Sequence, residues 1–411
     1  MTWNPPPRPV WVADQIAAGE LVGPLALHPL DPDALISTAV AVAGSADFGP
    51  AGWRSGFELL CVALRDEAQL HAVGAALTRS EIVRTLVNRL RIVAQGDPGG
   101  EIVDPWFVVG SARSGTSILH ELLALDPRRR APLAWETLAS VPAPRPGDVD
   151  SDPRVDQIDH EVRHWEAICP EYLTMHENGG RLPHECIFVT AHEFASEHWS
   201  GVHDVPSYNR WLQGADLTDA YRWHHRHLRW LQSAYPTERW VLKAPSHLSA
   251  LPALLAIYPD AKVIQTHRDP LQTIPSTISL MATLRWMRSN RVDVARLART
   301  MAKGVAALFD WVDTMRGDGS LPDHQFVDVR YDDLVVDPIA TVRSIYERLD
   351  APFAEAHGVA IGDYLGAKPK AKHGAHRYAL EDFGLDPADL RDRYGNYCER
   401  HRVPLGESDS A

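Results

Sequence analysis

Residues 105–127, PWFVVGSARSGTSILHELLALDP, constrain the fold of this chain more than any other stretch. The apolar run at residues 106–109 is too short for a helix and predicts a buried parallel strand. Residues 110–115 form a loop of small residues around one cation, Arg113, and the apolar spacing at residues 116–125 predicts a helix that an Asp-Pro pair ends. Loop amides and a helix N-terminus that face one point bind anions. The stretch therefore predicts a phosphate site.

Gly110 and Gly115 have the spacing of a nucleoside-triphosphate P-loop, G-x4-G-K-[ST], but Thr116 occupies the lysine position. Without that lysine, the contact to the terminal phosphates of a nucleotide is lost. The loop is P-loop-like, and we interpret it as a phosphate cradle that is not built for ATP and magnesium. A glycine turn with no ligand is the alternative, because a lone glycine pattern is weak evidence.

Residues 112–117, ARSGTS, resemble the 5′-phosphosulfate loop of the sulfotransferases that use 3′-phosphoadenosine-5′-phosphosulfate (PAPS). That loop reads P-[KR]-S-G-T-[ST], and this chain has alanine in place of the proline. The resemblance implies that Arg113 contacts the 5′-phosphosulfate. It also implies that the oxygens of this group are bound at the start of the helix by Ser114, Gly115, Thr116 and Ser117.

A second phosphate-type signature joins Arg268 and Ser276, in the segment HRDPLQTIPSTIS. Arg268 follows a strand pattern at residues 262–266, and Ser276 lies eight residues later in a predicted helix. PAPS sulfotransferases carry Arg and Ser at this separation, so the resemblance implies a 3′-phosphate site. The planar fork of arginine suits a phosphate. The alternative is that Arg268 pairs with a core carboxylate and Ser276 is an ordinary helix residue.

Lys243 ends an apolar strand pattern at residues 240–243. The resemblance implies that Lys243, together with Arg113, offsets charge on the leaving phosphate; an ordinary lysine at a strand end is the alternative. Cytosolic members of the family carry a catalytic histidine two residues after this lysine, where this chain has Pro245. His247 follows the lysine by four residues, so its role stays open between a catalytic base and a capping or structural histidine.

Glu136 is the other candidate for the base, 23 residues after Arg113. Protein-tyrosine and some bacterial sulfotransferases place a glutamate base just after the loop helix. The resemblance therefore implies that Glu136 takes the proton of the acceptor hydroxyl. A glutamate in the first turn of a helix is also common for electrostatic reasons alone. Between the two base candidates, Glu136 is preferred to His247.

Residues 366–378 form a basic island in an acidic chain. Members of the family close over the nucleotide with a basic, glycine-containing segment in this part of the chain. The resemblance implies that Lys372 and Arg377, or their neighbours Lys370 and His373, contact the cofactor. A solvated basic loop is the alternative.

The net charge of −13 disfavours nucleic-acid binding. The four cysteines include no C-x-x-C pair, which predicts a reducing compartment and no cysteine zinc site. The N-terminus lacks a signal-peptide pattern, and no apolar stretch has the length of a membrane span, so we expect a cytoplasmic enzyme.

Histidines give no zinc pattern either. The His-Glu pairs that begin at residues 120, 184 and 192 lack the second histidine of H-E-x-x-H. We expect His224, His225 and His227 to lie on a partly exposed helix or to line the acceptor pocket rather than to bind metal. The sequence therefore predicts no metal ion.

Four strand patterns, at residues 106–109, 240–243, 262–266 and 326–329, alternate with helical segments. This alternation predicts a three-layer α/β fold, in which helices cover both faces of a central parallel sheet and ligands bind beyond the strand C-termini.

Three parts are predicted along the chain. Residues 1–100 form a helical N-terminal extension, in which Thr78-Arg79-Ser80-Glu81 has the capping-box pattern of a helix start. Residues 101–400 form the α/β domain, with a surface loop at residues 140–153 and a helical insertion at about residues 154–236. Residues 401–411 are a tail.

The resemblance covers about residues 105–380. It implies transfer of a sulfuryl group from PAPS to a hydroxyl or amine of a small-molecule acceptor, which leaves adenosine 3′,5′-bisphosphate and needs no metal. The tryptophan-rich insertion suggests an apolar acceptor. One alternative is a P-loop phosphotransferase or kinase, against which Thr116 argues and which magnesium dependence would reveal. The other alternative is a non-catalytic nucleotide-binding protein, which would bind PAPS without turnover.

Overall fold

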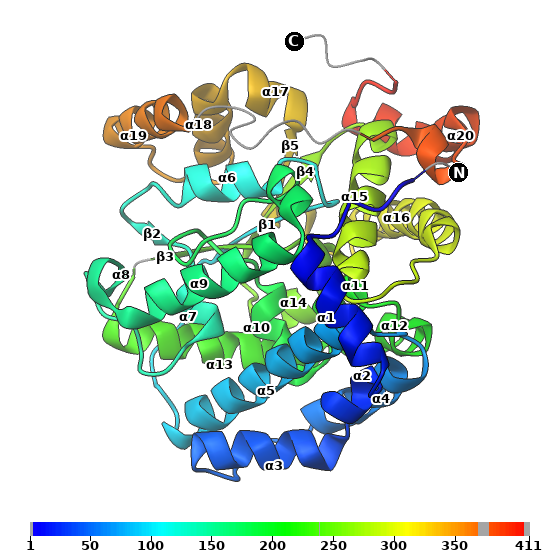
Figure 1. Cartoon of the computed structure of the whole chain (residues 1–411). Helices are drawn as coiled ribbons and strands as arrows, with labels where there is room; N and C mark the ends of the chain where they lie inside the picture. The colour runs from blue at the N-terminus through cyan, green and yellow to red at the C-terminus, as the bar shows by residue number, and fades with distance from the viewer. Residues whose placement is uncertain (1–2, 238, 369–377, 407–411) are drawn as a thin grey trace.

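The computed structural model describes residues 3–237, 239–368 and 378–406. A five-stranded sheet lies at its centre, with helices on both sides (Figure 1). The strands are β1 (Trp106–Gly110), β2 (Arg129–Arg130), β3 (Arg239–Lys243), β4 (Lys262–His267) and β5 (Phe326–Arg330). Their order is β2-β3-β1-β4-β5, and every neighbouring pair is parallel. The predicted α/β fold and its four strands are confirmed; the two-residue strand β2 was not predicted.

Alternate residues of each strand point into two different apolar layers. On one face, Trp106 and Val108 of β1 pack in a cluster with Leu119 of α6 (Thr116–Leu123). This layer is completed by α17 (Tyr331–Val336), α18 (Pro338–Arg348) and α19 (Glu355–Ala367). On the other face, Phe107 and Val109 belong to a second cluster. The period of two in a strand therefore produces the three layers.

The second face is covered by five helices and one 3-10 helix. They are α13 (Thr218–Ala234), η3 (Pro245–Ala250), α14 (Leu251–Ile257), α15 (Pro270–Trp286), α16 (Val294–Gly317) and α20 (Pro387–His401). The sequence predicted one helix at residues 246–257, whereas the structure begins this segment as the 3-10 helix η3 and continues it as α14. Pro252 lies at the junction and has no N–H to continue the pattern of hydrogen bonds.

The N-terminal helices pack on the insertion rather than on the sheet. They are α1 (Val10–Glu20), α2 (Pro24–Leu27), α3 (Pro32–Ala43), α4 (Trp53–Asp66) and α5 (Ala72–Ala94). Phe57 and Leu60 of α4 share one apolar cluster with Phe194, Trp199 and Tyr208 of the insertion. The described part of residues 1–100 is helical, as predicted. Because these helices share a core with the insertion, the prediction that residues 1–100 form a separate domain stays a prediction.

A capping box does not start a helix at Thr78, because α5 begins six residues earlier. His71 caps it, since its Nδ1 accepts a hydrogen bond of 3.0 Å from the Gly74 N–H. Thr78 Oγ1 shares a hydrogen bond of 2.8 Å with His203 Nε2 of the insertion, and Glu81 pairs with Arg288 at 2.6 Å. The predicted helix start is wrong because tertiary contacts use both side chains of the pattern.

The insertion contains α9 (Pro153–Ile168), α10 (Ile187–Thr190), α11 (Glu197–Val202), α12 (Pro206–Gln213) and α13. The segment before it, predicted as a surface loop, includes the one-turn helix α8 (Asp148–Ser151). His224 and His227 of α13 have no exposed surface, so the expectation of a partly exposed helix is wrong for these two residues. Trp199 and Trp223 are also buried, and both belong to apolar clusters of the core.

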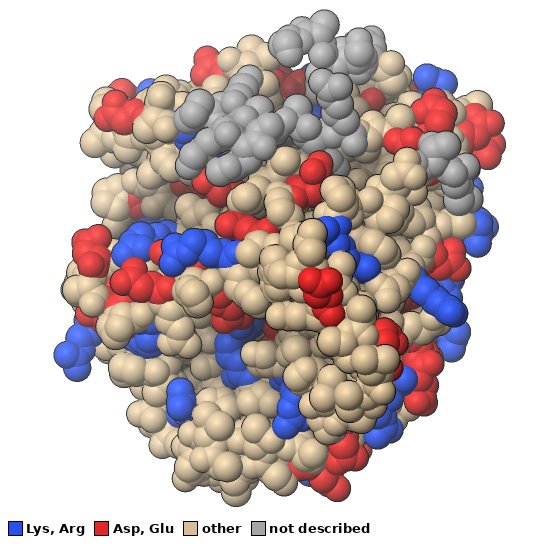
Figure 2. All heavy atoms as spheres, viewed as in Figure 1, with Lys and Arg blue, Asp and Glu red and all other residues tan. Residues whose placement is uncertain are grey.

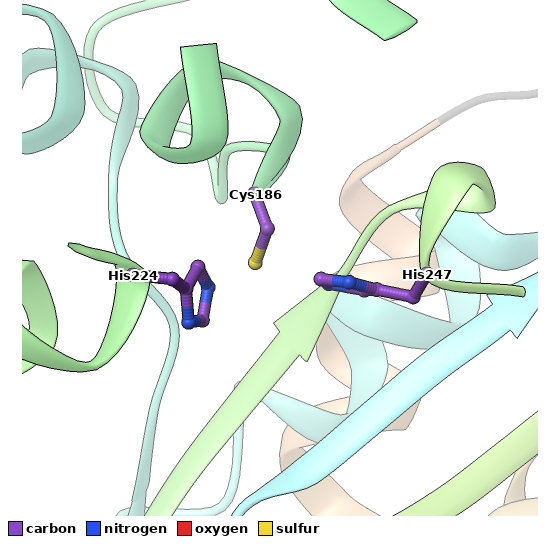
Figure 3. A group of neighbouring side chains, drawn as sticks. All are labelled: Cys186, His224 and His247. Atoms are coloured by element: carbon purple, nitrogen blue, oxygen red, sulfur yellow. The ribbon is translucent and has the colours of Figure 1, made fainter. Parts of the chain in front are cut away.

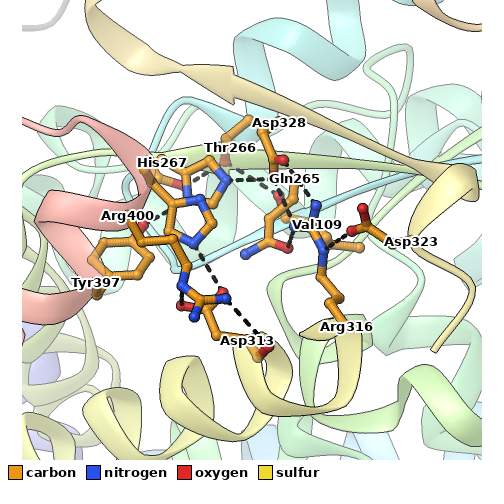
Figure 4. A network of polar contacts seen from close by, with 12 residues as sticks. Val109, Gln265, Thr266, His267, Asp313, Arg316, Asp323, Asp328, Tyr397 and Arg400 are labelled. Atoms are coloured by element: carbon orange, nitrogen blue, oxygen red, sulfur yellow. Dashed lines mark hydrogen bonds and ion pairs between the residues drawn. The ribbon is translucent and has the colours of Figure 1, made fainter. Parts of the chain in front are cut away.

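The C-terminal helix α20 is joined to the sheet by a polar network (Figure 4). His267 at the end of β4 shares one hydrogen bond of 2.9 Å with the Tyr397 hydroxyl and another of 2.9 Å with Asp328. Arg316 donates to both oxygens of Asp328, at 2.7 and 2.8 Å. Residues from β4, β5, α16 and α20 are thereby held at one point.

Charged side chains of both signs are scattered over the face shown in Figure 2, without a continuous basic stripe. Among the described residues, no single helix has the length and apolar character needed to cross a membrane. The segments Val10–Glu20 and Pro24–Ala43 meet these criteria only when they are taken together. The chain bends by 89° between them.

Candidate active site

Three of the predicted cations lie after the C-terminal ends of neighbouring strands. Arg113 follows β1, Lys243 ends β3 and Arg268 follows β4, and β1 lies between the other two strands. Because the carboxyl ends of parallel strands meet at one edge of the sheet, the fold brings these cations to a common site.

The glycines of the loop after β1 adopt backbone conformations that other residues rarely adopt. Gly110 has φ of 138° and Gly115 has φ of 89°. A Cβ at Gly115 would lie 2.7 Å from the Tyr331 ring, and one at Gly110 would lie 2.3 Å from Thr266 Oγ1. Both positions therefore require glycine, and the loop can pass close to its neighbours.

Ser114 braces the loop from within. Its hydroxyl donates to the Ser111 carbonyl at 2.6 Å and shares a 2.6 Å hydrogen bond with Thr266 Oγ1. The side chain has no exposed surface. Thr116 and Ser117 open α6, so their backbone lies at the positive end of that helix. The predicted contact of the Ser114 side chain with a ligand would compete with these bonds.

Arg113 is a partly buried cation held by neutral partners. Its Nε donates to Ser276 Oγ at 3.1 Å, and its Nη1 donates to the Met175 carbonyl at 2.6 Å. Within the described part of the chain, Arg113 forms no ion pair with a carboxylate. Burial lowers the pKa of Arg113 below its ordinary value, and the nearby Arg268 adds to this effect. A guanidinium placed in this way lacks only a counter-anion.

Arg268 and Ser276 are brought to the same loop. Arg268 Nη1 donates to the Arg113 carbonyl at 3.0 Å, and its guanidinium lies 3.9 Å from the centre of the Tyr331 ring. Ser276 lies in α15 and is almost fully buried against the Arg113 side chain. Two predicted signatures that are 155 residues apart in the chain therefore adjoin in space.

Lys243 joins the loop helix to a residue that sequence reasoning missed. Its Nζ donates to Ser117 Oγ at 3.1 Å and forms an ion pair of 2.5 Å with Glu185. The Lys243 side chain is 3% exposed and the Glu185 side chain 17% exposed. Glu185 is therefore the carboxylate that reaches this edge of the sheet while keeping access to solvent.

In the sequence, Glu185 stands out only as the second residue of a His-Glu pair that lacks the second histidine of a zinc motif. A glutamate on an irregular segment gives no periodic signal, and its partner Lys243 lies 58 residues away. Burial alone would raise the pKa of Glu185, but Lys243 and His176 more than offset this effect, and the pKa is lowered. The carboxylate is therefore ionised at neutral pH.

Glu136 has its carboxylate occupied by other partners. It is 1% exposed, pairs with Arg130, and accepts a hydrogen bond of 2.9 Å from the Leu133 N–H at the start of its own helix α7 (Ala134–Leu138). These contacts correspond to the first-turn role that the sequence left open as the alternative.

His247 lies in the apolar layer behind β1. Its Nδ1 shares a hydrogen bond of 2.6 Å with the Tyr221 hydroxyl, and its ring meets Phe107 edge to face, with centroids 5.0 Å apart. Burial lowers the pKa of His247 to about 3, and Lys243 and His120 add to this effect while Glu185 opposes it. Such an imidazole is neutral and a weak base.

Lys372, Arg377, Lys370 and His373 lie outside the described residues. The described start of the basic island is Lys368, which pairs with Glu121 at 2.7 Å and with Glu177 at 2.9 Å. Since Glu121 belongs to α6, the basic island begins next to the loop helix.

Comparisons with known proteins agree with this geometry. The model of the sulfotransferase family matches residues 105–355. An omega-hydroxy-beta-dihydromenaquinone-9 sulfotransferase, Stf3, of Mycobacterium bovis is 26% identical over 308 residues, which are 72% of this chain and 76% of that protein; its counterpart in Mycobacterium tuberculosis has the same values.

Two crystal structures share the whole architecture. Sulfotransferase STF1 from Mycobacterium tuberculosis H37Rv has 30% identity and a TM-score of 0.77, with 89% of this chain and 98% of that chain covered. Sulfotransferase STF9 from Mycobacterium avium has 25% identity and a TM-score of 0.83, with 92% and 98% covered. The family model matches most of the α/β region, which carries the phosphate-type loop and the converging cations. This chain therefore belongs to the sulfotransferase family.

Proposed function

We propose that this enzyme takes the sulfuryl group from PAPS and transfers it to a hydroxyl of an apolar small molecule. The observation that supports a phosphosulfate donor most directly is Arg113. It is a partly buried guanidinium beside a glycine loop, and its bonds within the described residues go to neutral oxygens. A phosphate or sulfate group would supply the missing negative charge.

The residues around the loop fit such a donor. Arg113, Gly115, Thr116 and Ser117 would hold the 5′-phosphosulfate at the start of α6. Arg268 and Ser276 would hold the 3′-phosphate, since both already contact Arg113. PAPS, when bound, would supply the sulfuryl group and leave as adenosine 3′,5′-bisphosphate.

Lys243 and Glu185 would have different roles in the transfer: one stabilises charge and the other accepts a proton. Lys243, joined to Ser117 at the loop helix, would offset charge on the leaving oxygen. Glu185 would accept the proton of the acceptor hydroxyl. An anion bound beside Lys243 would weaken the field that this lysine exerts on Glu185, which would raise the carboxylate pKa towards the value that a base needs. We propose structural roles for Glu136 and His247, which replace the roles expected from the sequence.

The acceptor class is inferred from the relatives. The two curated relatives are named for an omega-hydroxy-beta-dihydromenaquinone-9, a hydroxyl on a largely apolar molecule. We extend that class, and not the particular compound, to this chain. The cytoplasmic location expected from the sequence stays a prediction.

Calorimetric titration with adenosine 3′,5′-bisphosphate and with AMP, in EDTA, tests the donor site. We expect the bisphosphate to bind at least about tenfold more tightly, because the 3′-phosphate adds charge-assisted hydrogen bonds. Arg268→Ala should remove this preference. Arg343→Ala, a partly exposed arginine of α18 that pairs with Glu355, is the matched control and should bind like the parent.

Equal or absent binding of both nucleotides would contradict the proposal and favour a P-loop phosphotransferase, which magnesium-dependent phosphate transfer from ATP would reveal. Transfer of labelled sulfate from PAPS to apolar alcohols tests turnover. Bisphosphate binding without turnover on any alcohol or amine would instead favour a non-catalytic nucleotide-binding protein.

A further inference from the structure

Three side chains with metal-binding atoms converge behind the sheet (Figure 3). Cys186 precedes α10, His224 lies in α13 and His247 lies in η3. One ligand atom from each lies within 4.8 Å of the other two, and the residues are 0%, 0% and 1% exposed. We name this group the Cys186 cluster.

Each imidazole of the Cys186 cluster has one nitrogen engaged and one without a partner. The Nδ1 of His224 shares a hydrogen bond of 2.7 Å with the Tyr258 hydroxyl, and the Nδ1 of His247 shares one of 2.6 Å with the Tyr221 hydroxyl. Both Nε2 atoms are buried and have no hydrogen-bond partner among the described residues. A buried polar atom without a partner is unfavourable, so two of them beside a buried thiol require an explanation.

We propose that the Cys186 cluster binds one thiophilic d10 cation, Cu⁺ or Zn²⁺. The ligands are the Cys186 thiolate and the Nε2 atoms of His224 and His247. Thiolate and imidazole are the ligands that these ions prefer. Tyr221 and Tyr258 then accept the Nδ1 protons and orient the rings, as outer partners of metal-bound histidines commonly do. Binding releases the thiol proton to solvent.

The spacing of the Cys186 cluster is slightly wider than a metal site needs. Metal–nitrogen bonds of about 2.0 Å and metal–sulfur bonds of about 2.3 Å place neighbouring ligands about 3.5 to 3.8 Å apart. The three ligand atoms, now within 4.8 Å of one another, must approach by about 1.3 Å or less. Small side-chain rotations at three separate elements supply a movement of this size.

Charge favours Cu⁺ over Zn²⁺ in the Cys186 cluster. One thiolate and Cu⁺ form a neutral unit, whereas one thiolate and Zn²⁺ leave a net positive charge in an apolar layer. The neighbouring carboxylate, Glu185, is already paired with Lys243. A trigonal site also needs no fourth ligand, which suits a cluster enclosed by Phe107, Tyr221 and Tyr258.

A second group, His267 with Asp328 and His401, meets the same distance condition but has a different explanation. Arg316 donates to both Asp328 oxygens, so a cation is already present there (Figure 4). His401 shares its Nε2 hydrogen bond with Asp313 at 2.9 Å. The hydrogen-bond network accounts for that group, and the Cys186 cluster has no comparable account.

A metal in the Cys186 cluster would stabilise the segment that carries Glu185. Cys186 directly follows Glu185, and the Cys186 N–H donates to the Lys243 carbonyl at 2.8 Å. The ion would connect this irregular segment to α13 and to η3. Its role would be structural, since the cluster is enclosed in the apolar layer behind β1.

Metal content and affinity of the full-length protein test this inference. The protein is produced with added copper or added zinc, and its metal is measured by mass spectrometry. Cu⁺ affinity is then measured by anaerobic competition with bathocuproine disulfonate, and Zn²⁺ affinity by competition with a chromophoric chelator. We expect about one Cu⁺ per chain and an affinity more than about 100-fold above that of Cys186→Ser and of the double variant His224→Gln/His247→Gln.

Cys398→Ser, which changes a buried cysteine outside the cluster, should keep the parent affinity. Bound metal should raise the unfolding temperature of the parent and not that of Cys186→Ser, since a ligand of the native state stabilises it. Tight Zn²⁺ binding in place of Cu⁺ would support the site and overturn the preference for Cu⁺. Weak binding of both ions, or equal binding by parent and Cys186→Ser, would overturn the site itself.

If the variants fold poorly, Cu⁺ and Co²⁺ are each added anaerobically to the unmodified protein instead. A thiolate-to-metal charge-transfer band with either ion would show cysteine ligation, and the absence of such a band with both ions would overturn the inference. None of these readouts depends on PAPS or on turnover, so failure here leaves the proposed sulfuryl transfer unaffected.

Discussion

At the scale of single residues, Glu185 and Glu136 show how two glutamates acquire different roles from their partners. Glu185 keeps 17% of its side chain exposed and pairs with Lys243, which also donates to Ser117 of the loop helix. Glu136 is 1% exposed and is held by Arg130 and by the Leu133 N–H. The first arrangement leaves the proposed base beside a cation and open to solvent, while the second encloses a carboxylate in a helix start and a buried ion pair.

Glu185→Gln should lower kcat by about 10²- to 10⁴-fold, because the amide keeps the shape of the side chain but cannot act as a base. Binding of adenosine 3′,5′-bisphosphate should change by no more than about tenfold, since Arg113 and Arg268 remain. Initial rates with saturating PAPS, together with calorimetry, measure the two effects.

Glu136→Gln is the matched control for Glu185→Gln. It should lower the free energy of unfolding by about 1–3 kcal/mol, because Arg130 loses its charged partner, and leave kcat within a few-fold of the parent. A loss of kcat in Glu136→Gln as large as in Glu185→Gln, with unchanged stability, would return the base to Glu136.

At the scale of elements, the loop between β1 and α6 depends on backbone conformations that only glycine adopts without strain. Gly115 combines φ of 89° with a close approach to the Tyr331 ring, which also lies under Arg268. Loop, ring and arginine are therefore packed as one unit. A change in any of them would move the amides that face the anion.

Gly115→Ala should weaken binding of adenosine 3′,5′-bisphosphate by at least about tenfold, because the new methyl group would be strained and would displace Tyr331. Gly304→Ala, at an open position inside α16, should instead raise the free energy of unfolding by about 0.5–1 kcal/mol. Calorimetry and urea unfolding of both variants make the comparison. Unchanged nucleotide binding in Gly115→Ala would argue against the loop as the donor site.

At the scale of the whole molecule, the N-terminal helices and the insertion stabilise each other through one core. Phe57 of α4 meets Phe194 of the insertion edge to face, with centroids 4.9 Å apart, and Phe194 stacks on Trp199 at 5.4 Å. Since neither part buries its aromatic side chains alone, the two should unfold together.

Phe57→Ala should lower the free energy of unfolding by about 3–5 kcal/mol, because it leaves a cavity in this shared core. Val62→Ala on the same helix, with Val62 41% exposed, should change it by less than about 0.5 kcal/mol. Urea unfolding followed by fluorescence measures both. A separate early transition in Phe57→Ala, with activity retained, would show that residues 1–100 unfold as an independent unit.

The pH dependence of stability should report the network around Asp328. Burial alone would raise the pKa of Asp328, but hydrogen bonds from Arg316 and His267 outweigh this and hold it well below its ordinary value. The unfolded chain therefore takes up the proton first, so this contribution to stability is present at neutral pH and decreases as the pH falls below about 4.

Asp328→Asn should accordingly lower the free energy of unfolding at pH 7 by about 1–3 kcal/mol, and the difference from the parent should shrink below about pH 4. Asp363→Asn, on an exposed position of α19, should match the parent throughout. Urea unfolding between neutral and acidic pH measures the difference. A difference that stays constant with pH would show that the lost ion pair is not its source.

Prediction from sequence worked where a pattern is local. The strand, glycine loop and helix at residues 105–125 are one continuous stretch, and the period of apolar residues is enough to assign each part. It failed at Thr78 and Glu81, where the capping-box pattern lies inside α5 and tertiary partners use both side chains. A local pattern thus predicts structure reliably only where its side chains have no partners from distant parts of the chain.

The chain by itself therefore determined the parallel α/β fold and the phosphate-type loop around Arg113, because glycine conformation and apolar periodicity act over a few residues. The Arg268 and Ser276 pair was implied by the family resemblance. Only the tertiary structure decided that Lys243 pairs with Glu185, that Glu136 is enclosed, and that Cys186 lies with His224 and His247. Tertiary packing decides which residues tens of positions apart become partners. The spacing of residues in the sequence does not predict these pairs.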